Sequence, residues 1–362
     1  MNLAKRVTSM DVAKRAGVSR TTVSFVLNKV EGMQISEETK KRVFTAAHDL
    51  GYVPDAAAQA LASGRSKTIG LFLARRSQVI ASDMYLTQVM EVLVHEVNRH
   101  GMRLLLEVVE DYEHPDSYLK LVRSNSIDGV LYSGPLIQDS ALRSLIDHGI
   151  PTVLMGNLPN MPYPSVDIDN RAAAERAVQH LIQLGHRRIA CITNANPSYS
   201  GAAGRLQGYR DALDCAGIPF EVELVRYGDF DPESGFHQMN NLIEAGKPMT
   251  AAFVASDIVA LGAMAAIREH GMEIPQDIAL VGFDDVPVAK YIHPSLTTIK
   301  LPMEELTRCA CDMLVGMIRG KHPEQKNVLL EAKLIVRKSC GAASIGMHRP
   351  ELPVPPELPI PG

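Results

Sequence analysis

Long apolar runs are missing from this 362-residue sequence, although 46% of its residues are hydrophobic. No stretch of about 18 consecutive apolar residues occurs, so no transmembrane helix is expected. The first residues, MNLAKRVTSMDVAKRAG, are polar and charged and lack the apolar segment of a secretory signal. With 22% charged residues, the composition is that of a globular protein, which we expect in the cytoplasm, and the length suits two or three domains.

Paired cysteines are also missing. The five cysteines are an odd number without CxxC spacing, so we expect reduced thiols and neither a disulfide framework nor a zinc site. The sequence contains no P-loop, HExxH or GxSxG motif, and its twelve histidines do not cluster at metal-ligand spacing. We therefore expect no enzyme activity, no cofactor and no metal.

A surplus of positive charge is absent too, because the formal net charge is −4 at pH 7. Taken alone, this value argues against a nucleic-acid partner. The charge is unevenly distributed, however: residues 1–68 contain eleven Lys or Arg and six Asp or Glu, a net +5, so the remainder carries −9. A small basic head on a large acidic body indicates that the head meets an anionic partner.

Residues 1–54 are expected to form an all-α head of three short helices. Each helix begins with a residue that can cap its amino end, namely Thr8 (with Asp11 as its capping-box partner), Ser19 and Ser36. Each helix is too short to be stable alone. Their apolar positions would together close a small core, formed by Val12, Ala13, Ala16, Val23, Val26, Leu27, Val43, Phe44, Ala47 and Leu50.

Residues 10–28, MDVAKRAGVSRTTVSFVLN, have the layout of a helix-turn-helix, in which the Gly17 turn sets the angle between two helices. The second helix can enter the major groove of double-stranded DNA and present its first turn to base edges. Its amino end and Ser19 suit a phosphate. Arg20 can bind guanine in bidentate fashion. The outward residues are Arg20, Thr21, Thr22, Ser24, Phe25 and Asn28, of which Asn28 is better placed for a backbone phosphate.

Residues 55–67 separate the head from the body. The run Asp55–Ala62 is rich in alanine, the best helix former, but it is too short to be helical alone. We expect a helix that orders only when a partner packs on it, with a plain linker as the alternative. At the other end, residues 341–362 are rich in proline and are expected to be an extended, largely disordered tail.

Residues 68–340 alternate between apolar strands and helical stretches that often end at glycine. This alternation predicts an α/β body with two doubly wound parallel-sheet lobes and a cleft between them. The segments 296–300 and 302–319 are expected to cross back to the first lobe. The predicted strands are 69–73, 103–109, 129–132, 152–155, 188–193, 223–227, 251–255 and 278–282.

The helix-turn-helix, followed by ISEETKKRVFTAAHDLGYVPDAAAQALASGRSKTIGL, resembles the lactose/galactose repressor (LacI/GalR) family of bacterial transcriptional regulators. The resemblance extends to about residue 340. It implies a homodimer on a pseudo-palindromic operator, associated with the nucleoid. It also implies a body that is periplasmic-binding-protein-like, with a small-molecule effector, a sugar or sugar derivative, bound between the lobes.

The resemblance assigns roles to residues of the head and of the linker. Arg20, Thr21 and Phe25 match the three base-reading positions, although Phe25 departs from the polar or basic residue that is usual there. The ring can contact a thymine methyl, or it packs on the third helix instead. Leu61 matches the leucine that is inserted into the minor groove, and Ala58 the small residue where paired hinge helices approach each other.

In the body, the resemblance implies an effector site between the lobes. A carboxylate that accepts from hydroxyls, a guanidinium and an aromatic ring suit a sugar. Gly156 departs from the aspartate that many members carry, so Asn157 is expected to replace part of its bonding. Asp257 is either a ligand contact or a helix cap. The expected effector contacts are Asp83, Tyr85, Asn157, Arg205, Phe230, Ser256, Asp257 and Asp284.

The function expected from these features is that of a DNA-binding transcriptional repressor whose operator affinity depends on an effector. Two alternatives remain: a regulator that uses a phosphoprotein corepressor, and a solute-binding protein without a role on DNA. The latter would need export, and it would not carry a basic three-helix head. No leucine heptad follows residue 340, so dimers are expected and tetramers are not.

Overall fold

The computed structural model describes residues 7–28, 32–53, 65–75, 77–110, 114, 116–124, 126–158 and 161–342. Ala58, Leu61 and the proline-rich tail from residue 343 onward lie outside the described residues. The chain forms two compact units: a head unit, Met1–Thr68 with Asn125–Asp128, and a body, Ile69–Ser124 with Gly129–Gly362. Within the described ranges, no helix is long and apolar enough to cross a membrane.

The head contains the three expected helices, α1 (Ser9–Ala16), α2 (Arg20–Leu27) and α3 (Glu37–Asp49). Thr8 and Asp11 form the predicted capping box, Gly17 ends α1 in the left-handed conformation, and Ser19 and Ser36 cap α2 and α3. These local predictions are confirmed, and they fix the turn between α1 and α2. The buried cluster comprises Val12, Ala13, Ala16, Val23, Val26, Val43, Ala46 and Ala47.

The predicted place of Phe44 in this core is wrong, because its side chain is 46% exposed. The buried face of α3 consists of Val43, Ala46 and Ala47. Residues three and four positions apart share a helix face, whereas the position after Val43 is rotated by about 100°. Phe44 therefore points toward solvent.

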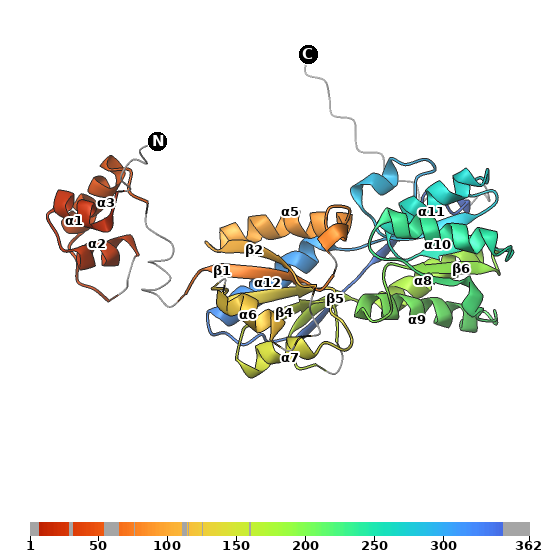
Figure 1. Ribbon diagram of the computed structural model, residues 1–362, viewed down its shortest axis with the longest axis horizontal. Helices are drawn as coiled ribbons and strands as arrows, with labels where there is room; N and C mark the ends of the chain where they lie inside the picture. Colours follow the sequence, from red (N-terminus) through yellow and green to blue (C-terminus); the bar gives the residue numbers. More distant parts are fainter. Residues whose placement is uncertain are drawn as a thin grey trace, which may run out of the picture. The chain divides into compact units, whose positions relative to one another are not determined.

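The first lobe of the body is built on a six-stranded sheet with the order β11-β5-β4-β3-β1-β2 (Figure 1). The β11–β5, β5–β4, β4–β3 and β3–β1 pairings are parallel. The strands are β1 (Thr68–Leu73), β2 (Arg103–Val108), β3 (Gly129–Ser133), β4 (Thr152–Met155), β5 (Ser165–Ile168) and β11 (Asn327–Leu330). The helices are α5 (Met84–Arg99), α6 (Ser117–Ser124), α7 (Ser140–Asp147) and α12 (Met303–Ile318).

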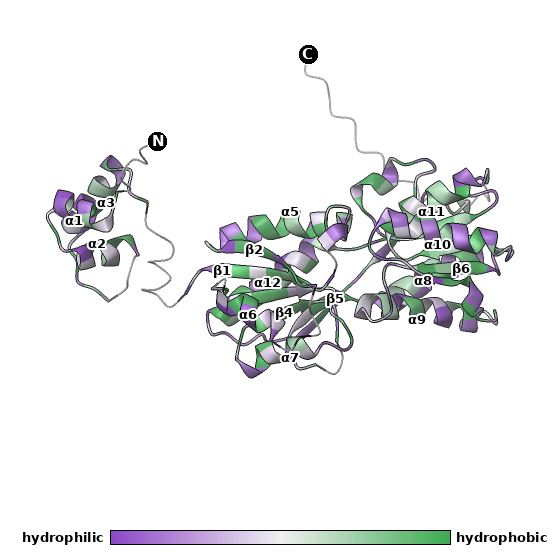
Figure 2. Ribbon diagram, in the orientation of Figure 1, coloured by the Kyte–Doolittle hydropathy of each residue, from purple (hydrophilic) through white to green (hydrophobic). Residues whose placement is uncertain are grey.

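Successive residues of β1 point to opposite faces of this sheet. Leu71 and Leu73 share a core with residues of α5 and α12, whereas the Phe72 ring between them lies 5.9 Å from the Tyr118 ring of α6. This alternation explains why helices cover both faces, α5 on one side and α6 and α7 on the other in Figure 1. The strands of both lobes are mainly hydrophobic, and hydrophilic residues gather on the outer helices (Figure 2).

The second lobe repeats this arrangement with the sheet order β12-β10-β9-β8-β6-β7. Four pairings are parallel, and the edge pairing β10–β12 is antiparallel. The strands are β6 (Ile189–Thr193), β7 (Val225–Tyr227), β8 (Ala251–Val254), β9 (Ala279–Asp284), β10 (Thr297–Lys300) and β12 (Lys333–Ile335). The helices are α8 (Asn170–Gln183), α9 (Ser200–Cys215), α10 (Pro232–Glu244) and α11 (Asp257–Glu269).

The chain passes between the lobes three times, from β5 to α8, from β10 to α12 and from β11 to β12. The expectation for residues 302–319 is therefore confirmed, since α12 packs on α5 and on the first sheet. The expectation for residues 296–300 is wrong, because β10 pairs with β9 and remains in the second lobe. The crossing comes one segment later, at residues 301–302. The eight predicted strands are present, whereas β5, β10, β11 and β12 were not predicted.

Candidate functional site

A pocket in the body opens where strands of both sheets end. Its lining includes residues at, or up to three positions after, the carboxyl ends of nine strands, β1 and β3–β10. Parallel α/β sheets bind ligands at this edge, because strand ends and helix amino ends converge there. The empty space, including its open mouth, measures about 730 Å³.

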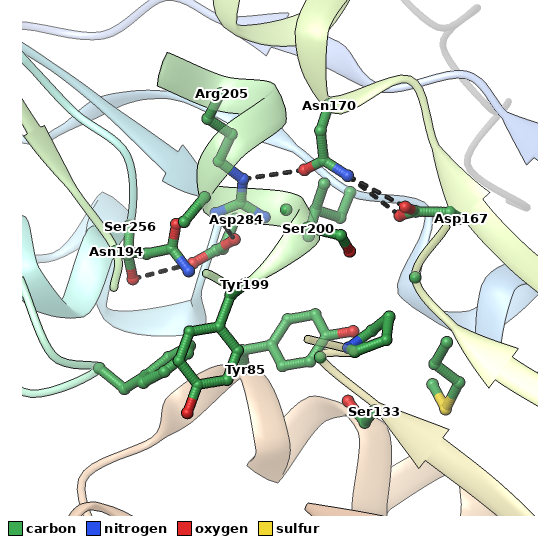
Figure 3. A pocket seen from close by; sticks show the side chains of 18 of the residues that line it. Tyr85, Ser133, Asp167, Asn170, Asn194, Tyr199, Ser200, Arg205, Ser256 and Asp284 are labelled. Carbon is green, nitrogen blue, oxygen red and sulfur yellow. Dashed lines mark hydrogen bonds and ion pairs between the residues drawn. The ribbon is translucent and has the colours of Figure 1, made fainter. Parts of the chain in front are cut away.

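A chain of polar side chains crosses one wall of the pocket (Figure 3). The Ser256 hydroxyl donates to Asp284 Oδ2 (3.0 Å), and Arg205 Nη1 lies 3.5 Å from Asp284 Oδ1. Arg205 Nε donates to Asn170 Oδ1 (2.9 Å), and Asn170 Nδ2 in turn reaches both carboxylate oxygens of Asp167 (3.1 and 3.2 Å). The guanidinium thus orients an amide from α8 and a carboxylate from β9 at once.

Burial governs the electrostatics of this wall. It raises the pKa of both Asp167 and Asp284 to about 6, and hydrogen bonds together with the Arg205 charge oppose the rise. Burial also raises the pKa of Tyr85, with the charges of Asp167 and Asp284 adding to the effect. Two partly desolvated carboxylates that still accept hydrogen bonds are strong acceptors for ligand hydroxyls.

The opposite wall joins the two lobes through aromatic and cationic groups. Arg75 forms a buried ion pair with Asp83, which also caps α5 through Leu86 N (3.0 Å). The Arg75 guanidinium lies 4.5 Å from the centroid of the Phe230 ring, and the Tyr199 ring meets Phe230 edge-on at 5.1 Å. Tyr85 and Tyr199 face the polar chain across the pocket (Figure 3). These rings offer apolar surface opposite hydrogen-bonding groups.

Buried polar atoms without a partner gather in this pocket. Six side-chain nitrogen or oxygen atoms are buried and unpaired in the described part of the chain, and four of them belong to pocket residues. Such atoms are rare in folded proteins, since each costs about 1–3 kcal/mol. The four atoms are Arg75 Nε, Ser133 Oγ, Asn194 Oδ1 and Ser200 Oγ.

Six of the eight expected effector contacts meet in the pocket, whereas Asn157 and Asp257 do not line it. The six are Asp83, Tyr85, Arg205, Phe230, Ser256 and Asp284. Asp257 is fully buried, and it accepts from Val286 N (3.0 Å) and Thr298 Oγ1 (2.6 Å). It is the first residue of α11 and not its cap, which is Ser256. Both readings of Asp257 are therefore corrected: it ties α11 to two neighbouring segments.

Asn157 lies beside a neighbouring hollow, one position beyond the pocket residue Gly156. Glycine is required at position 156, because φ is +134° and a Cβ would lie 2.4 Å from Pro135 Cδ. The expected loss of a carboxylate is offset by Asp167 on the adjacent strand β5. Sequence reasoning missed Asp167 and also Arg75, Asn170, Asn194 and Tyr199. Of these, Asn194 directly follows a predicted strand and Arg75 comes two positions after one, which is a signal that could have been used.

In the head, helix α2 presents the predicted DNA-facing residues. Ser19 Oγ accepts from Thr22 N (3.0 Å), Arg20 and Thr21 are exposed, and Arg20 Nε donates to Ser9 Oγ (3.0 Å). Phe25 is half-buried, and Asn28 is the C-cap residue with its amide on Ser24 Oγ (3.2 Å). The amino end of α2 thus offers a capped helix terminus beside an exposed guanidinium.

One cluster of candidate cation ligands occurs among the described residues, with Glu96, His100 and Asp312 holding ligand atoms within 4.8 Å of one another. Arg99 already donates to Glu96 Oε2 and Asp312 Oδ1, each at 2.7 Å. Its guanidinium bridges the two carboxylates, so we interpret the cluster as an ion-pair network that ties α5 to α12.

Comparison with known proteins agrees with both units. The model "Bacterial regulatory proteins, lacI family" matches residues 8–55, and "Periplasmic binding protein-like domain" matches residues 178–340. The HTH-type transcriptional regulator CelR of Thermobifida fusca is 35% identical over 346 residues, which is 94% of this chain and 100% of the relative. The HTH-type transcriptional repressor PurR of Edwardsiella ictaluri (strain 93-146) is 38% identical, over 92% of this chain and 96% of its own.

Solved structures show the same likeness. A lac repressor dimer bound to operator and the anti-inducer ONPF aligns with a TM-score of 0.80 and 29% identity, covering 93% of this chain and 99% of that one. A CelR–cellobiose complex aligns with a TM-score of 0.70 and 33% identity, covering 92% and 100%. With a helix-turn-helix head, two parallel-sheet lobes and relatives that match nearly end to end, the chain belongs to the lacI family of bacterial regulatory proteins.

Proposed function

We propose that this member of the lacI family is a dimeric transcriptional repressor whose affinity for a pseudo-palindromic operator changes when a neutral sugar or sugar derivative fills the pocket between the lobes. The observation that carries the proposal is the group of four unpaired buried polar atoms on residues that line the same pocket as Asp167, Arg205 and Asp284. A ligand with several hydroxyls would satisfy these atoms while its apolar face packs on aromatic rings.

The charges of the pocket support a neutral effector. Both guanidiniums in the lining already face carboxylates, Arg75 paired with Asp83 and Arg205 with Asp284. Asp167 adds a third carboxylate, which is held by an amide and not by a cation of its own. A phosphorylated sugar would bring at least one negative charge to a pocket without a spare cation. The cellobiose in the CelR complex, by its name a neutral disaccharide, also supports this class.

The edge of the first sheet supports dimerisation. Strand β2 lies at this edge, and Leu104, Leu105 and Leu106 on it are each only half-buried. An edge strand with apolar side chains invites another chain unless a partner covers it. A second copy of this chain would cover it, and a dimer would present two heads to two operator half-sites. Sedimentation equilibrium showing stable tetramers or monomers would contradict this part of the proposal.

The head supports a role on DNA. Its positive charge and the exposed amino end of α2 suit a phosphate backbone and base edges. Leu61, outside the described residues, is proposed as the hinge contact in the minor groove, and Ala58, also outside them, as the small residue where the paired hinge helices approach each other. Replacing Leu61 with alanine should weaken operator binding at matched salt and leave effector binding intact. We assign the pocket a binding role and no catalytic one, as the names of the relatives support.

The decisive experiment combines a ligand screen with an operator-binding assay. Neutral sugars and their phosphates are compared by dye-based thermal shift, because the chain has no tryptophan for intrinsic fluorescence. A ligand at about 100 times its Kd adds about 2.7 kcal/mol to the stability of the folded state. A neutral sugar should bind, and it should change affinity for an operator selected from random duplexes. Binding only by phosphorylated sugars, or an unchanged operator affinity, would refute the proposal.

A further inference from the structure

A second hollow adjoins the pocket on the far side of Asp167. We propose that this hollow is a second subsite, so that the effector is a carbohydrate of at least two sugar rings, one in each hollow. The inference rests on the proposed function, since it assigns a size and shape to the neutral sugar that the pocket binds. It concerns residues that the expected effector contacts did not include, apart from Asn157.

The two hollows adjoin each other and share part of their lining. Asp167, Ile168, Asn170 and Ser200 line both of them. Asp167 and Asn170 are the end of the polar chain that begins at Ser256, and they mark the right-hand boundary of the pocket in Figure 3. The junction therefore carries a carboxylate of raised pKa and an unpaired Ser200 hydroxyl. A ligand that passes from one hollow to the other must run beside these two groups.

The lining of the second hollow suits a sugar ring more than a charged group. Ile137 and Leu329 are large apolar residues that remain 52% and 55% exposed, and both face this space. They offer apolar surface to the C–H face of a pyranose. The charged groups there are already engaged: Asp169 caps α8, and Arg171 forms an ion pair with Asp211. No guanidinium of the described lining is thus left for a phosphate.

Both lobes contribute to the second hollow. Ile137, Asn157 and Leu329 belong to the first lobe, and Arg171 and Gly204 to the second. A ring bound there would contact both lobes, as a ring in the first pocket does. Each ring thereby adds to the free energy that holds the lobes together, so a longer ligand would bias the lobe equilibrium more strongly than a single ring. Affinity should therefore rise steeply from one ring to two.

The test uses matched sets of monosaccharide, disaccharide and trisaccharide built on glucose, galactose, mannose or xylose, titrated calorimetrically against the full chain. In the set that binds, we expect the disaccharide to bind at least about tenfold more tightly than its monosaccharide, a difference of about 1.4 kcal/mol. The double variant Ile137→Ala/Leu329→Ala should lose about fivefold in disaccharide affinity and keep monosaccharide affinity within about twofold. Both residues are at least half exposed, so the variant should fold.

Val222→Ala is the matched control, since Val222 is a 63% exposed apolar residue of the second lobe that lines neither hollow. It should bind every sugar like the parent chain. Two results would refute the second subsite while the proposed function stands. One is a monosaccharide that binds as tightly as its disaccharide, and the other is a double variant that keeps the parent chain's affinity for both sugars. If no sugar of any set binds, the proposed effector class itself fails.

Discussion

The guanidinium of Arg75, in the first lobe, lies 4.5 Å from the centroid of the Phe230 ring, in the second. Asp83 forms an ion pair with this guanidinium. Phe230 itself has a left-handed backbone conformation, with φ +59°. A non-glycine residue in this conformation costs free energy, so its position must be stabilised by its surroundings. The contact joins the lobes in the wall of the effector pocket.

Replacing Phe230 with leucine should weaken effector binding. The ring supplies the cation–π contact with Arg75 and the edge-on contact with Tyr199. A desolvated cation–π contact is worth about 1–2 kcal/mol, so effector affinity should fall by about five- to thirtyfold. Calorimetric titration with the effector found in the screen measures this change. Phe230→Tyr keeps the ring and is the control; equal losses in the two variants would show that the ring face does not contribute.

Replacing Asp167 with asparagine should stabilise the effector-free protein and abolish tight effector binding. Burial raises the pKa of Asp167 from 3.8 to about 6, so the folded state holds this proton more tightly than the unfolded state. The stability contributed by protonation is fully present below pH 4 and is lost as the pH rises through about 6. At about pH 7.5 the variant should be more stable by up to about 3 kcal/mol, about 1.4 kcal/mol per pKa unit.

This gain should shrink as the pH falls from about 7 to 4, as measured by urea unfolding at a series of pH values. The same titration predicts that the parent chain loses effector affinity below about pH 6, because protonation of Asp167 and Asp284 removes hydrogen-bond acceptors. A variant that is less stable than the parent at neutral pH, or an effector affinity that is constant between about pH 5 and 8, would contradict the assigned role of these carboxylates.

Asp257 should behave as a structural residue. Its carboxylate accepts from Val286 N and Thr298 Oγ1 in the interior of the second lobe. Alanine at this position would leave two buried donors unpaired, each at a cost of about 1–3 kcal/mol, so the variant should be destabilised by about 2–6 kcal/mol. Asp257→Asn keeps an acceptor and should lose less. Chemical denaturation measures stability, and effector affinity of the folded variants should be unchanged, since the side chain does not line the pocket.

Features that depend on residues close together in the sequence could be predicted, whereas features that depend on residues far apart in the sequence could not. The caps at Thr8, Ser19 and Ser36 depend on residues three positions away and were predicted correctly. The long apolar strands were also found, because their pattern is local. Strand β5 was missed, since it has four residues with Asp167 in the middle. Its role depends on where the chain crosses to α8, which brings Asp167 within reach of Asn170.

The gaps in the predicted site have a similar cause. Asn157 was expected to replace part of the bonding of an aspartate that is absent at Gly156, but the first pocket is lined by Gly156, whose backbone passes close to Pro135, and Asn157 lines the adjoining hollow. A shift of one residue changes the direction of a side chain. Arg75 was missed because its partners, Asp83 and Phe230, lie 8 and 155 positions away in the sequence. A pattern within one strand cannot report such a contact.

Arg20 should set base preference at one step of the operator. It is exposed at the first position of α2, beside the capped amino end of the helix. Arg20→Ala should cost about 1–3 kcal/mol at the preferred site and relax the preference at one base pair, because bidentate contact with guanine is lost. Arg20→Lys keeps the positive charge but lacks the planar pair of N–H donors that binds guanine in bidentate fashion. It should therefore restore non-specific affinity for DNA but not the base preference. Fluorescence anisotropy at matched salt, with operators altered singly at each position, separates the two effects. A uniform loss across all sequences would instead assign Arg20 to the phosphate backbone.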